Sequence, residues 1–92
     1  MITVVLPSQL RELTGGVGSV ALEDGGATVG QALQALRARH PAVYDRVCTE
    51  GREVRPHVNV FVDREDIRWS GGLETPVAEG SEVVILPSVS GG

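Results

Sequence analysis

The chain has 92 residues, of which 41% are hydrophobic and 22% charged, a composition typical of one small globular domain. Its formal net charge of −4 argues against nucleic-acid binding, which needs a basic stripe to displace phosphate counterions. The longest aliphatic run, Val83–Leu86, is too short to span a membrane. The single cysteine, Cys48, excludes an internal disulfide and is expected to be a small buried hydrophobe. With no basic, apolar leader at the N-terminus, these features predict a cytoplasmic protein.

The N-terminal segment predicts a hairpin. Alternating apolar residues indicate one strand over Ile2–Leu6 and a second over Ser19–Glu23. The intervening segment, Leu10–Gly16, is expected to be a turn-rich loop that is anchored by its two leucines.

The clearest helix begins at Thr28. Thr28 and Gln31 have the spacing of a capping box, in which each side chain satisfies the other residue's free backbone N–H. An apolar stripe follows at helical spacing, formed by Val29, Ala32, Leu33 and Leu36. Pro41 ends the helix, and a further short helical turn is predicted over Ala42–Cys48.

The second half of the chain predicts the remaining strands. Val58–Val62 alternates, Ile67–Trp69 is expected to be a short strand with Trp69 at the edge of the core, and Val83–Leu86 is typical of a central strand. This order fits an α+β fold of the β-grasp (ubiquitin-like) type. We expect a mixed sheet of about four to five strands, with one main helix across one face and the first and last strands parallel at the centre.

No side-chain cluster predicts catalysis or metal binding. The acidic segment Asp63–Asp66 is interpreted as a solvated turn, because no further ligands follow at EF-hand spacing. His40 and His57 have no partners that would complete a metal site.

The chain ends in Gly91-Gly92, the last two residues of a short tail that follows the predicted central strand and a proline. We therefore predict a β-grasp domain over residues 1–87 and a flexible tail over residues 88–92. Extended, this tail spans at most about 16–18 Å, enough to carry the terminal carboxylate into another protein's pocket. Glycine has no Cβ, so a tail that ends in glycine can pass through a narrow channel. We expect partner enzymes to recognise the tail at Val89, Ser90 and Gly91. A carboxylate is inert until an activating group such as AMP is attached, after which a sulfur donor can displace AMP and leave a thiocarboxylate on Gly92.

Strand alternation predicts an exposed apolar patch beside this tail. If Val83 and Ile85 face the helix, the residues that face away on three neighbouring strands are Val5, Phe61, Val84 and Leu86. Monomers seldom expose such patches without a use, so we hypothesise that partner enzymes dock there. A loop of the same chain or a homodimer contact would be the alternative cover.

The stretches Ser70–Val77 and Gly80–Gly92 resemble the C-terminal half of the ThiS/MoaD family of ubiquitin-like sulfur-carrier proteins. Leu10–Gly15, Thr28–Leu33 and Val58–Val60 match the family's earlier landmarks in order. Within the family, the chain is most similar to actinobacterial carriers of a cysteine-forming pathway.

The resemblance implies a protein co-substrate rather than an enzyme, with no bound cofactor. An E1-like adenylating enzyme of the MoeB/ThiF type would activate Gly92 at the expense of ATP. A synthase of a cysteine, cofactor or natural-product pathway would accept the sulfur, and a metalloprotease would trim the carrier or release the product. Two alternatives remain: a ubiquitin-like modifier conjugated through Gly92, and a non-covalent β-grasp interaction module.

Overall fold

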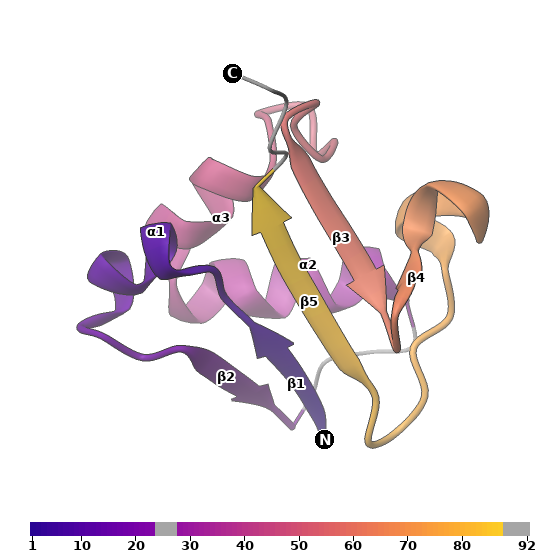
Figure 1. Cartoon of the computed structure of the whole chain (residues 1–92), viewed down its shortest axis with the longest axis horizontal. Helices are drawn as coiled ribbons and strands as arrows, with labels where there is room; N and C mark the ends of the chain where they lie inside the picture. Colours follow the sequence, from indigo (N-terminus) through magenta and orange to yellow (C-terminus); the bar gives the residue numbers. More distant parts are fainter. Residues whose placement is uncertain (24–27, 88–92) are drawn as a thin grey trace.

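Five strands form one mixed sheet in the computed structural model, which describes residues 1–23 and 28–87 (Figure 1). The strands are β1 (Ile2–Val5), β2 (Ser19–Leu22), β3 (Val58–Val62), β4 (Glu65–Asp66) and β5 (Glu82–Pro87), in the spatial order β2-β1-β5-β3-β4. β1 and β5 are parallel, and the other pairs are antiparallel. The predicted β-grasp topology, with the last strand at the sheet centre, is therefore confirmed.

Two helices, α2 (Val29–Arg39) and α3 (Pro41–Val47), lie behind the sheet in the view of Figure 1. The predicted capping box begins α2: the Gln31 N–H donates to Thr28 Oγ1 and the Thr28 N–H donates to Gln31 Oε1, both at 3.2 Å. The whole apolar stripe of α2 is buried in one core with the inward residues of β1, β3 and β5. Burial of this stripe holds the helices on one face of the sheet and leaves the opposite face open.

The segment between β1 and β2 differs from the predicted loop. It contains a short helix, α1 (Ser8–Arg11), and a 3-10 turn, η1 (Glu12–Thr14), which ends at Gly15 with φ of 72°. Leu10 packs against the core, whereas Leu13 is 37% exposed. Only one of the two expected leucine anchors therefore packs against the core.

The predicted strand over Ile67–Trp69 is wrong. Strand β4 is only two residues long, and residues 67–69 form a 3-10 turn, η2 (Ile67–Trp69), followed by η3 (Gly72–Glu74). The Asp66 carboxylate accepts a hydrogen bond from the Arg68 N–H at 2.9 Å, which caps this turn and ends the pairing with β3. Ile67 takes the buried position and Trp69 is 82% exposed, so the expected place of Trp69 at the core edge is also wrong.

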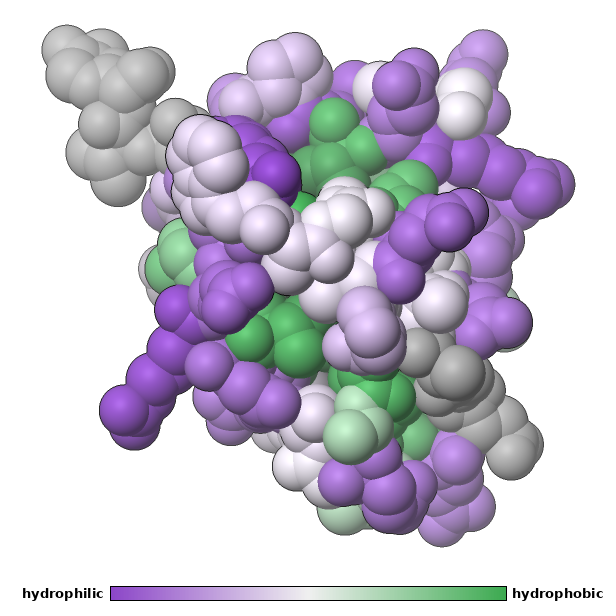
Figure 2. All heavy atoms as spheres, turned by 90° about the vertical axis from the view of Figure 1, so that its right-hand side faces the viewer, coloured by the Kyte–Doolittle hydropathy of each residue, from purple (hydrophilic) through white to green (hydrophobic). Residues whose placement is uncertain are grey.

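Figure 2 shows the molecule from the β4 side. Hydrophobic side chains appear there only in small separate areas between hydrophilic ones, consistent with a core that is closed along this edge. Within residues 1–23 and 28–87, none of the helices combines the length and the apolar character that crossing a bilayer requires.

Candidate functional site

The C-terminal tail begins at the end of the central strand. Pro87, the last residue of β5, lies opposite Val58 on β3, at the end of the sheet near α1 and α3 (Figure 1). The residues predicted to carry sulfur or to be recognised, Val89, Ser90, Gly91 and Gly92, lie outside the described residues. The structure therefore defines the base of the tail, and the role of the tail stays a prediction.

The four residues of the predicted docking patch share the open face of the sheet. Val84 lies opposite Val5 of β1 on one side and opposite Phe61 of β3 on the other, so these three side chains form a row across the sheet. Leu86 is two residues further along β5, towards the tail, and is 43% exposed. We call Val5, Phe61, Val84 and Leu86 the open-face patch. Their common face is as predicted, but only Leu86 is exposed, and Val5, Phe61 and Val84 are half-buried. Their use in docking remains a prediction.

The acidic turn after β3 holds the start of β5. Asp63 and Arg64 have positive φ angles of 47° and 78° and connect β3 to β4. The Ser81 hydroxyl donates to Asp63 Oδ2 at 2.9 Å, and the Glu82 N–H donates to Asp63 Oδ1 at 3.1 Å. These hydrogen bonds stabilise the ionised carboxylate and lower the pKa of Asp63. This pairing was missed from the sequence because the two segments are separated along the chain.

The cysteine is placed as expected. Cys48 is 2% exposed, and its burial raises the pKa of the thiol. The neighbouring Tyr44 is also buried, its pKa is raised mainly by desolvation, and its hydroxyl accepts a hydrogen bond from Gln34 at 2.9 Å. A thiol kept protonated in the interior is a packing residue rather than a nucleophile.

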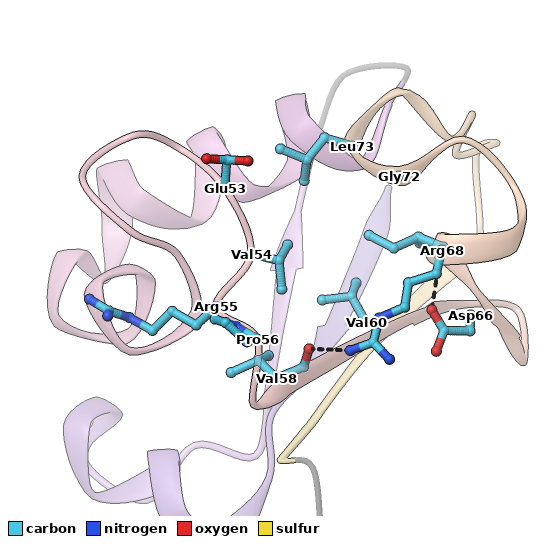
Figure 3. A pocket seen from close by; sticks show the side chains of 11 residues that line it. Glu53, Val54, Arg55, Pro56, Val58, Val60, Asp66, Arg68, Gly72 and Leu73 are labelled. Carbon is cyan, nitrogen blue, oxygen red and sulfur yellow. Dashed lines mark hydrogen bonds between the residues drawn. The ribbon is translucent and has the colours of Figure 1, made fainter.

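A hollow of about 270 Å³ lies along the part of β3 that β4 leaves unpaired (Figure 3). Its walls include Val54, Val60 and Leu73, and the Arg68 guanidinium crosses it to donate to the Val58 carbonyl at 3.4 Å. Among the described residues, no three His, Cys, Asp or Glu side chains gather to hold a metal ion.

A mixed sheet wrapped on a helix, with its central last strand leading into the C-terminal tail, defines a ubiquitin-like β-grasp protein. The chain belongs to the ThiS family, whose model matches residues 4–92. This confirms the resemblance that was identified in the sequence.

The relatives of this chain are named either as sulfur carrier proteins or as small archaeal modifier proteins. It is 40% identical over 93 residues to the sulfur carrier protein CysO of Mycobacterium tuberculosis (strain ATCC 25618 / H37Rv), with 99% of this chain and 98% of the relative covered. It is 42% identical over 69 residues to small archaeal modifier protein 1 of Haloferax volcanii, with 75% of each chain covered. Among solved structures, the BexX/CysO complex of Amycolatopsis orientalis contains a chain that matches with a TM-score of 0.89 and 40% identity, and all of both chains is covered.

Proposed function

We propose that this protein is a sulfur carrier whose reactive group is the α-carboxylate of Gly92. A carboxylate oxygen attacks the α-phosphorus of ATP on a partner E1-like enzyme, which forms an acyl-adenylate and releases pyrophosphate. A hydrosulfide equivalent then attacks the acyl carbon and AMP leaves with the anhydride oxygen, so that one oxygen is replaced by sulfur. Because a synthase afterwards removes the sulfur, the chain is a co-substrate and not a catalyst. We place this cycle in the cytoplasm, where ATP is available.

The proposal rests on the similarity of the whole chain to sulfur carriers. The likeness to sulfur carriers extends along essentially the whole chain, and the family match reaches residue 92. In the structure, β5 is the central strand, and Pro87 at its end is the point from which the tail leaves. A rigid sheet anchor with a narrow, glycine-ended extension is the arrangement that a terminal acyl donor requires.

The open-face patch is the proposed contact for both classes of partner. An activating enzyme of the MoeB/ThiF type and a sulfur-accepting synthase would each bury Phe61, Val84 and Leu86 while they receive the tail. The solved complex of a related CysO with BexX supports binding through this fold to another protein. A metalloprotease that trims the carrier or releases the product completes the proposed set of partners.

A second candidate function is conjugation to proteins. The likeness to small archaeal modifier proteins supports this candidate. The same acyl-adenylate would then form an amide with a lysine of a target. All eight basic residues of this chain are arginine, so it offers no lysine for chains built on itself.

Intact mass spectrometry of the protein purified from its native host distinguishes these functions. A sulfur carrier shows a fraction in which one oxygen is replaced by sulfur, and a modifier shows high-mass conjugates. A chain that stays unmodified under sulfur-replete conditions contradicts both and leaves a non-covalent interaction module. Deletion of Gly92 should abolish either modification, whereas Glu50→Gln, in an exposed loop, should leave it unchanged.

A further inference from the structure

The arginine side chains differ in whether they are already engaged. Of the eight arginines, five place the guanidinium on a backbone carbonyl or over a ring: Arg11 on Leu6, Arg39 on Ala21, Arg55 on Asp45, Arg68 on Val58, and Arg37 over Tyr44. Within residues 1–23 and 28–87, the side chains of the other three, Arg46, Arg52 and Arg64, make no hydrogen bond or ion pair. Three exposed cations therefore remain available to a partner.

Only one of these three lies at the base of the tail. Arg46, near the C-terminal end of α3, lines a groove of about 180 Å³ together with His57, Gln9 and Pro87. Leu10 and Ile85 supply apolar walls, and none of the described residues that line this groove is acidic. We call it the tail-base groove. Pro87 is the residue after which the tail begins, so a group bound here would touch the protein next to the reactive segment.

The surface on the other side of Arg46, outside the tail-base groove, also carries more positive than negative charge. Arg46 and His57 also line an adjoining shallow hollow with Asp45 and Arg55. The Arg55 guanidinium lies on the backbone carbonyl of Asp45 at 2.9 Å, so Arg55 and Arg46 together outweigh the single carboxylate of Asp45. At the opposite end of β5, by contrast, lie the carboxylates of Asp63, Glu79 and Glu82. Arg46 is therefore an unengaged positive charge beside the base of the tail, on a chain whose net charge is −4.

We propose that the tail-base groove receives a carboxylate side chain of the enzyme that activates Gly92. This inference rests on the proposed function and adds the chemistry of the partner at that site. The planar guanidinium of Arg46 can donate two parallel hydrogen bonds to one carboxylate, and His57 and Gln9 line the same groove. Apolar walls exclude water from one side of the pair, which strengthens it relative to a fully solvated pair. The contact orients the carrier so that its tail points into the active site, while the open-face patch supplies apolar area.

The test uses the full-length protein with the E1-like adenylating enzyme of the same genome, in an ATP–pyrophosphate exchange assay. For Arg46→Glu, we expect KM for the carrier to rise about tenfold with kcat within about twofold, because a charge at an interface rim acts on association. Arg46→Lys should give a smaller rise, since it keeps the charge and loses the fork. Arg52→Glu is the matched control: it makes the same charge change at another unengaged arginine and should leave KM unchanged. Thermal melting checks that each variant is folded.

The dependence of KM on salt concentration provides an independent test of the proposed ion pair. For the wild type, KM for the carrier should increase with ionic strength, and for Arg46→Glu this dependence should be weaker. An Arg46→Glu variant that is folded and has the same KM as Arg52→Glu overturns the inference and leaves the proposed function standing, as does a variant in which only kcat falls. Absence of pyrophosphate exchange with the wild type contradicts the proposed function itself and the inference with it.

Discussion

Ser81 and Asp63 join the start of the central strand to the turn that follows its neighbour. The buried Ser81 hydroxyl donates to Asp63 Oδ2 at 2.9 Å, while the Glu82 N–H donates to the other oxygen. One exposed carboxylate therefore satisfies two donors at the lower end of β5 in Figure 1. This contact links the start of β5 to the turn between β3 and β4.

Asp63→Asn should lower the melting temperature at neutral pH. Hydrogen bonds from the Glu82 N–H and then the Ser81 hydroxyl hold the folded-state pKa of Asp63 below its ordinary value of 3.8. A depressed pKa stabilises the fold above the ordinary value, and this contribution is lost as the pH falls through the folded-state pKa. The difference in melting temperature between wild type and variant should therefore shrink below about pH 4. Asp45→Asn is the control, because it removes an exposed carboxylate that pairs with no side chain in the described part of the chain. Equal effects of the two variants would refute the role of Asp63.

Phe61→Asp should abolish adenylation of Gly92 while the protein stays folded. Phe61 is half-buried beside Val84, on the face that no helix covers, so a carboxylate there disrupts apolar docking more than the core. Pyrophosphate exchange measures the activation, and circular dichroism measures the fold. Ala42→Asp adds the same charge at an exposed position of α3 and should be activated normally. Unchanged activation of Phe61→Asp would remove the open-face patch from the proposal.

Thr28→Ala should cost about 1 kcal/mol of the free energy of unfolding, because it leaves the Gln31 N–H at the start of α2 without its acceptor. Urea denaturation measures the loss. Ser8→Ala removes a hydroxyl from the first residue of α1, where the side chain caps no backbone N–H, and should cost less. Equal losses of unfolding free energy in the two variants would show that a hydroxyl in the capping box stabilises the protein no more than a hydroxyl that caps nothing.

Trp69→Ala should change the free energy of unfolding by less than about 0.5 kcal/mol, since the indole is 82% exposed. Its neighbour Ile67 is buried, and Ile67→Ala should cost about 2–5 kcal/mol. Trp69 is the only tryptophan, so native fluorescence reports on it directly. A blue-shifted emission that is protected from acrylamide would contradict the exposed position.

Cys48 should react with a thiol reagent only after unfolding. Burial removes access and raises the pKa of the thiol, so the nucleophilic thiolate is scarce in the folded state. Alkylation followed by mass spectrometry, with and without urea, measures the difference. Rapid modification of the native protein would show that the helix α3 region opens readily.

Local patterns in the chain were sufficient for the helix and most strands. The Thr28–Gln31 pair marks where α2 begins, and the apolar stripe of α2 and the alternation in β3 each indicate which side of the element is buried. All three were found as predicted. Strand alternation likewise predicted that Val5, Phe61 and Val84 share one face of the sheet, as they do. Such periodicities are set by the geometry of a single helix or strand, so they can be recognised without knowing what lies opposite.

Contacts between distant segments were decided by the tertiary structure alone. The outward position of Trp69 depends on how Asp66 caps the turn that follows β4, and the carboxylate of Asp63 meets Ser81 only because β3 and β5 are paired. The tail-base groove likewise combines Arg46 from α3, His57 from the start of β3 and Pro87 from the end of β5. No periodicity records such meetings, because they arise from the packing of elements whose residues are far apart along the chain.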